Sequence, residues 1–127
     1  MAAKKKAPAP GMPWVSPYLF VKDPQSAIAF YREVFGFKVR FTHAGPDGKI
    51  KHAELTHETG VVMLGPESPD QKCHAPSTLN GSPVTLYVYV PDVDKIAAAA
   101  KAGGGIEVSE PADQFYGDRT TNIIDPE

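Results

Sequence analysis

Apolar residues along the first half of the chain follow a strand pattern and then a helix pattern. The stretch 15–21, VSPYLFV, is rich in β-branched and aromatic side chains, which predicts a strand. After the Asp-Pro pair at 23–24, apolar residues recur at helical spacing until Gly36: Ala27, Phe30, Tyr31 and Val34. Aspartate caps helix N-termini and proline suits the first helical position, so a helix over 24–35 is predicted.

Three further strands are predicted before residue 65. The stretches 37–44 and 49–58 flank the turn sequence GPDG, and VVMLG at 61–65 follows a second turn. The segment 66–83 then contains four prolines and no periodicity, which is typical of a connecting loop.

The same order of elements begins again after this loop. VTLYVYV at 84–90 predicts a strand, PDVDKIAAAAKAGGG at 91–105 a helix capped by Asp92 and closed by glycines, and IEVSE and TTNIID two more strands. An offset of 69 residues superposes Asp23 on Asp92 and Gly36 on Gly105. We interpret this as an internal repeat.

These patterns predict an α+β fold of tandem βαβββ modules. The second copy lacks a counterpart of the first copy's last strand, so the chain reads as truncated at its C-terminal end. The predicted organisation is a disordered tail over 1–14 and one domain over 15–127, with modules at 15–65 and 83–127.

Composition narrows the classes of function. The net charge is −2, and without the lysines at 4–6 ten basic side chains face fifteen acidic ones, so a nucleic-acid partner is not expected. No apolar run reaches the roughly 18 residues of a membrane span, and proline interrupts the basic N-terminus where a signal peptide would be apolar. The single cysteine, Cys73, excludes an intrachain disulfide and favours a reducing, cytoplasmic setting.

The two modules carry a family resemblance. The sequences PYLFVKDPQSAIAFYREVFGF and YVYVPDVDKIAAAAKAGG resemble the openings of modules in the vicinal oxygen chelate superfamily, which includes glyoxalase I, bleomycin resistance proteins and extradiol dioxygenases. The end of the chain, with YGDR and DPE, is similar to an uncharacterised branch. The resemblance implies a cavity in each curled sheet and, typically, a homodimer.

The resemblance also implies where metal ligands would fall. The family's ligand positions correspond to Ser16, Glu54 and Thr85, with a fourth beyond Glu127. Of these three, only Glu54 is a good ligand for a divalent metal, and a catalytic metal normally has three protein ligands. A complete metal site is therefore not expected.

The stretch HAELTHETG at 52–60 contains two histidines and two glutamates, residue types that bind metals. Alternation places His52 and Glu54 on one face, where they bind an ion together or share a proton. His57 is expected near the turn, in solvent. The hypothesis favoured by the missing ligands is that these residues are the remnant of a metal site.

Aromatic side chains and one arginine complete the candidate site. Tyr18, Tyr87 and Tyr89 either pack in the sheets or form a cavity wall that stacks flat ligands, together with Phe115. Arg119 either pairs with a nearby aspartate, at 113 or 118, or holds an anionic ligand.

Three functions follow from these candidates. The first is a metal-independent protein that binds a small molecule in the cavity. The second is a metal-dependent lyase or dioxygenase that uses Glu54 and a ligand from a further strand, with His52 beside it. The third is a structural interaction domain without a ligand.

Overall fold

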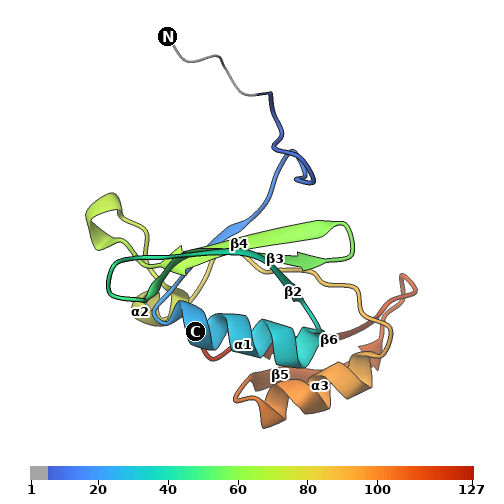
Figure 1. Ribbon diagram of the computed structural model, residues 1–127. Coiled ribbons are helices and arrows are strands. Elements are labelled where there is room, and N and C mark those ends of the chain that lie inside the picture. Colours follow the sequence, from blue (N-terminus) through green and yellow to red (C-terminus); the bar gives the residue numbers. More distant parts are fainter. Residues whose placement is uncertain (1–5) are drawn as a thin grey trace.

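A computed structural model describes residues 6–127 and arranges them in two α+β units (Figure 1). The first unit has a four-stranded sheet and the second a two-stranded sheet. The elements are β1 Tyr18–Val21, α1 Pro24–Phe35, β2 Lys38–Ala44, β3 Ile50–His57, β4 Gly60–Pro66, the 3-10 helix Pro69–Gln71, α2 Pro76–Leu79, α3 Val93–Ala102, β5 Ile106–Asp113 and β6 Arg119–Ile124. This architecture confirms the predicted α+β fold class.

Helix α1 begins and ends where the sequence predicts. The carboxylate of Asp23 accepts hydrogen bonds from the backbone N–H groups of Gln25 (3.1 Å) and Ser26 (3.3 Å). These bonds satisfy two of the N–H groups that have no partner within a helix. At the other end Gly36 adopts a φ of 74°, a left-handed conformation that glycine reaches without strain.

The first sheet has the strand order β1-β4-β3-β2, with β1 parallel to β4 and the other pairs antiparallel. Helix α1 covers one face of this sheet (Figure 1). Ala53, Leu55 and Leu64 are fully buried against it and form the centre of the core. Alternation therefore turns the neighbouring side chains of β3 to the opposite face, which we call the open face of the first sheet.

The predicted strand over 84–90 is not formed. Within residues 6–127 no β-ladder includes this segment. Leu86 and Val88 pack against the core, and the carbonyl oxygen of Tyr89 accepts a hydrogen bond from His57 Nε2 at 2.7 Å. A strand also needs a neighbour for its backbone groups. In the first unit β4 is that neighbour of β1, and no counterpart of β4 lies beside 84–90 in the described part of the chain.

The second unit consists of α3 and the hairpin of β5 and β6. Asp92 caps α3 through a hydrogen bond from the Lys95 N–H at 3.1 Å, and the glycines at 103–105 end the helix as predicted. The strands extend beyond the predicted stretches IEVSE and TTNIID toward each other, so the connecting turn is only 114–118. Pairing of the two strands satisfies backbone groups that a longer loop would leave free.

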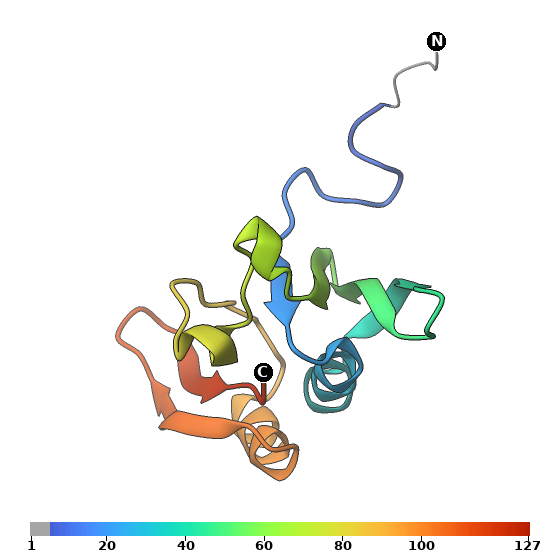
Figure 2. The ribbon, with the colours of Figure 1, turned by 90° about the vertical axis from the view of Figure 1, so that its left-hand side faces the viewer.

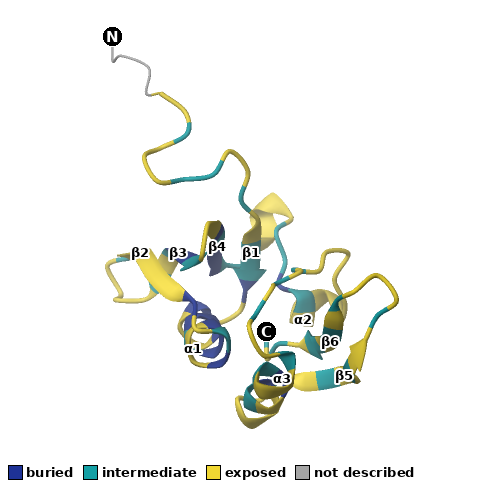
Figure 3. Ribbon diagram, turned by 90° about the vertical axis from the view of Figure 1, so that its right-hand side faces the viewer, coloured by how far each residue is buried: buried dark blue, intermediate teal, exposed yellow. Residues whose placement is uncertain are grey.

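The two units pack side by side, and α1 lies against α3 (Figure 2). The Tyr31 hydroxyl donates to the Asp125 carboxylate at 2.5 Å, and the Glu127 carboxylate accepts from the Lys22 N–H at 3.2 Å. Buried residues concentrate in the first unit, whereas the second is largely exposed or half-buried (Figure 3). The core is therefore built mainly by α1 and the first sheet.

The segment 6–14 leaves the first sheet on the side opposite α1 (Figure 1). It contains no helix or strand, and the Met12 N–H donates to the Ala9 carbonyl at 3.0 Å. Positions 1–5 of the tail predicted over 1–14 lie outside the described residues. In residues 6–127 no helix is long and apolar enough to cross a bilayer.

Candidate site on the open face of the first sheet

A chain of hydrogen bonds crosses the open face from β1 to β3. The Tyr18 hydroxyl lies 3.0 Å from His52 Nδ1, and His52 Nε2 lies 3.0 Å from Glu54 Oε2. The Glu54 side chain is only 12% exposed, because the sheet and its neighbours cover it. The structure therefore brings together three of the seven predicted site residues.

Arg40 on β2 completes this chain. Val39 pairs with Leu55 and Phe41 with Glu54, so Arg40 is an extra residue in a β-bulge. Its Nη1 forms an ion pair with Glu54 Oε1, and its Nη2 donates to the Pro10 carbonyl at 2.9 Å. We define Tyr18, His52, Glu54 and Arg40 as the open-face network.

Sequence reasoning missed Arg40. Val39 pairs with Leu55, which is fully buried, so alternation places Arg40 on the open face, and the register between β2 and β3 brings it to Glu54. The available signal was an arginine between two apolar strand residues, opposite a strand that carries a carboxylate.

Gly65 on β4 makes room for the tyrosine. A Cβ atom at this position would lie 2.8 Å from Tyr18 Oη and 2.9 Å from the Lys51 carbonyl oxygen. Only glycine lets the Tyr18 ring lie over β4 and reach His52. The backbone of β4 is therefore part of the site.

The network shifts the ionisation of its members. The hydrogen bond from His52, and then that from Arg40, lower the pKa of the Glu54 carboxyl against the opposing effect of burial. Burial, followed by the charge of Glu54, raises the pKa of Tyr18. At neutral pH Glu54 is thus a carboxylate and Tyr18 a phenol.

Aromatic rings surround the network. The Tyr18 ring lies 5.1 Å from that of Phe20 and stacks on His52 at 5.5 Å, and the Phe41 ring lies 6.2 Å from His52. Tyr18 is 40% exposed and Phe41 49% exposed. The open face therefore offers accessible aromatic surface beside a partly buried ion pair.

The other four predicted site residues lie outside the open-face network, two in the segment 84–90 and two in or beside the turn between β5 and β6. The hydroxyls of Tyr87 and Tyr89 both donate to Asp118 Oδ2, at 2.7 and 3.1 Å, and these bonds raise both tyrosine pKa values. Phe115 is fully exposed in the β5–β6 turn, and its ring contacts that of Tyr116. Tyr87 and Tyr89 thus contact the turn between β5 and β6, whereas Tyr18 contacts His52 on the first sheet.

Arg119 forms ion pairs with aspartates, as one of the two predictions for it proposed. Its guanidinium binds both carboxylate oxygens of Asp94 at 2.9 Å and one of Asp113 at 3.2 Å. The predicted partner at position 118 instead accepts from the two tyrosines. Carboxylates thus engage three of the five N–H groups of the Arg119 guanidinium.

His57 is also not the solvated side chain that the sequence predicted. Its ring stacks on Phe37 at 5.0 Å and its Nε2 bonds the Tyr89 carbonyl. Together with Gly36, Lys38, Thr56 and Glu58 it borders a depression of about 270 Å³. This contact ties the 84–90 segment to the first sheet.

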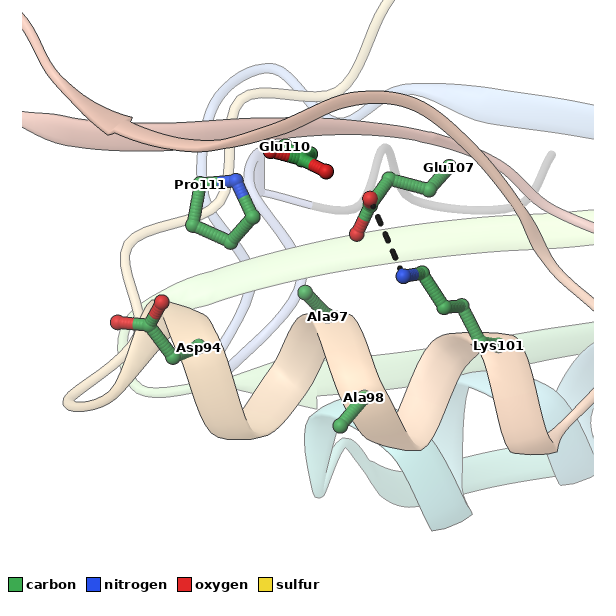
Figure 4. Close-up of a pocket in the computed structure, with 7 residues that line it drawn as sticks. All are labelled: Asp94, Ala97, Ala98, Lys101, Glu107, Glu110 and Pro111. Carbon is green, nitrogen blue, oxygen red and sulfur yellow. Dashed lines mark ion pairs between the residues drawn. The ribbon is translucent and has the colours of Figure 1, made fainter.

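A second depression, of about 370 Å³, lies between α3 and β5 (Figure 4). Lys101 on the helix and Glu107 on the strand form an ion pair across it at 3.2 Å. None of the seven predicted site residues lines either depression.

The donor set does not fit the metal site implied by the family resemblance. Both oxygens of Glu54 are engaged, one by Arg40 and one by His52. Ser16 and Thr85 offer only hydroxyls, which are poor ligands for the metals of such sites. Across residues 6–127 no group of three or more histidine, cysteine, aspartate or glutamate side chains is placed to hold an ion.

Comparisons with known proteins agree with this architecture. The chain is 38% identical over 117 residues to uncharacterised proteins of Mycobacterium bovis and Mycobacterium tuberculosis, which covers 90% of this chain and 77% and 69% of those proteins. Similar solved structures include TioX from Micromonospora sp. ML1, with a TM-score of 0.62, 25% identity and 89% of each chain covered.

More distant structures share the fold. A hypothetical protein from S. aureus has a TM-score of 0.64 at 21% identity, covering 88% of this chain and 87% of that one. A glyoxalase I mutant from Zea mays has a TM-score of 0.61 at 23% identity, covering 90% of this chain and 43% of that one. The family model of the Glyoxalase/Bleomycin resistance protein/Dioxygenase superfamily matches residues 11–127, and the chain belongs to this superfamily.

Proposed function

We propose that the protein binds a flat, largely apolar small molecule on the open face of the first sheet, without a metal. The observation that carries this proposal is the engagement of both Glu54 oxygens by Arg40 and His52 beside accessible aromatic rings. A carboxylate whose two oxygens both accept hydrogen bonds from side chains fixes the positions of those side chains instead of ligating an ion. The rings of Tyr18 and Phe41 supply the surface on which a flat molecule stacks.

The charges of the network support a neutral ligand. The ion pair of Arg40 with Glu54 balances one positive and one negative charge, so the open face has no uncompensated charge at its centre. An anion would have to compete with Glu54 for the guanidinium. The proposed ligand is therefore uncharged and aromatic.

The proposal is tested by a screen of neutral aromatic fragments, read by amide chemical shifts, on protein purified without chelator. We expect shifts at residues of β1, β2 and β3, weaker binding by Phe41→Ala, and unchanged binding by Phe115→Ala. The latter is a matched control because Phe115 is equally aromatic, fully exposed and located in the second unit.

Two results would overturn the proposal. About one equivalent of bound zinc, nickel, manganese or iron would support the metal-dependent lyase or dioxygenase instead. A screen in which no fragment binds would favour a structural interaction domain.

The protein is further proposed to act as a cytoplasmic homodimer. The single cysteine supports a reducing compartment. Large apolar side chains are more than half exposed in the segment 84–90 and in the second unit, among them Tyr87, Ile106 and Ile124, which supports association with a second copy.

A further inference from the structure

We propose that the ligand of the open face presents a hydrogen-bond donor to Tyr18, as a phenol or an aromatic N–H group does. This inference deepens the proposed binding function and depends on it, because it specifies the polar group of the same neutral aromatic ligand. It follows from the direction of the hydrogen bonds in the open-face network.

The direction is set at Glu54. An ionised carboxylate only accepts hydrogen bonds, and the Arg40 guanidinium only donates. His52 Nε2, 3.0 Å from Glu54 Oε2, must therefore carry a hydrogen and donate it. Glu54 thus selects the Nε2–H tautomer of the neutral imidazole.

The tautomer then determines what Tyr18 offers. In the Nε2–H imidazole, Nδ1 has a free lone pair and accepts, so the Tyr18 hydroxyl 3.0 Å away donates its single hydrogen to it. The phenol stays protonated because burial and the Glu54 charge raise its pKa. Tyr18 Oη can therefore only accept a further hydrogen bond.

The residue that carries this acceptor is partly exposed. Tyr18 is 40% exposed, and Phe41, whose ring lies near that of His52, is 49% exposed. A flat ring stacked on this surface brings a substituent to Tyr18 Oη. A ligand hydroxyl or N–H group donates a hydrogen bond to Tyr18 Oη. A ligand that has only acceptors cannot form this bond, because its lone pair then faces a lone pair of Tyr18 Oη.

Phenol and its methyl ether anisole separate these cases, because they share a ring and differ in the donor. Titrations followed by amide chemical shifts are made at pH 8, above the ordinary imidazole pKa of about 6.5. We expect phenol to bind about three- to tenfold more tightly than anisole, the worth of one net hydrogen bond. Tyr18→Phe should abolish this preference, and Phe115→Ala should preserve it.

Nitrogen chemical shifts of the His52 ring provide a readout that needs no ligand. We expect a protonated Nε2 and an unprotonated Nδ1 in the wild type at pH 8. An Nδ1–H tautomer, or anisole binding as tightly as phenol, would overturn this inference and leave the proposed binding function intact. Failure of both probes to bind, with other fragments also inactive, would overturn the binding function and this inference with it.

Discussion

Glu54 holds the open-face network together, since it accepts from Arg40 with one oxygen and from His52 with the other. Replacing it by glutamine keeps the shape but removes the charge that both partners face. We expect Glu54→Gln to lower the free energy of unfolding by about 1–3 kcal/mol at pH 7, because Arg40 loses its buried partner. Urea unfolding measures this loss, and Glu33→Gln on the exposed side of α1 is the control.

Thermal unfolding with added divalent metal tests whether Glu54 binds a metal ion or only stabilises the open-face network. We expect the same midpoint of thermal unfolding with and without metal in both proteins. A wild-type midpoint raised several degrees by metal, with the increase absent in Glu54→Gln, would identify Glu54 as a ligand.

The stabilising effect of Glu54 should also depend on pH in a defined direction. Folding lowers its pKa, so its contribution is fully present above the ordinary glutamate pKa of about 4.3 and is lost as pH falls through the lower folded value. The stability difference between wild type and Glu54→Gln should therefore shrink as the pH falls below about 4.3. Other carboxylates with lowered pKa values are present in both proteins, so their contributions to the pH dependence cancel in the difference. A difference that is constant or grows with acid would contradict this assignment.

Gly65 gives a steric test of the same site. Gly65→Ala places a methyl 2.8 Å from Tyr18 Oη and 2.9 Å from the Lys51 carbonyl, and the latter is backbone that cannot move freely. We expect a loss of about 1–3 kcal/mol in urea unfolding, as for overpacked cores. Gly81→Ala, with no atom within 4 Å of its added Cβ, should change stability little. Equal effects of the two substitutions would show that the Tyr18 geometry is not constrained.

Elements whose signals are local could be predicted from the sequence. The Asp-Pro start and Gly36 define α1 through capping, and alternation puts His52 and Glu54 on one face of β3. The bulge at Arg40 could not be predicted, because it depends on the register between β2 and β3. The contacts that complete the site are therefore the ones that depend on strand pairing.

The segment 84–90 illustrates the same limit. Its run of β-branched and aromatic residues is typical of a strand, and Leu86 and Val88 pack against the core, but periodicity carries no information about whether a neighbouring strand is present. We expect its amides to exchange hydrogen much faster than those of β3, which is paired on both sides. Hydrogen exchange followed by NMR or mass spectrometry tests this. Equal protection of both segments would mean that 84–90 has a partner strand in solution.

The two units of the molecule differ in what their sheets expose. The first sheet presents a polar network framed by aromatic rings, whereas the second presents the cross-strand pair of Ile106 and Ile124, 62% and 54% exposed. The neighbouring pair of Glu107 and Ile123 turns the other way, and Ile123 packs against the core. The first sheet is therefore suited to a small ligand and the face bearing Ile106 and Ile124 to protein contact.

This contrast locates the expected homodimer contact. Exposed cross-strand apolar pairs gain free energy when a second apolar surface covers them, and a charge there opposes that burial. We expect light scattering after size exclusion to give about twice the 13.7 kDa chain mass for the wild type, and a shift toward the monomer for Ile124→Lys. Glu33→Lys, which makes an even larger charge change on the exposed side of α1, should leave the mass unchanged. A wild-type monomer at all concentrations would refute the dimer, and a dimer unaffected by Ile124→Lys would place its interface elsewhere on the molecule.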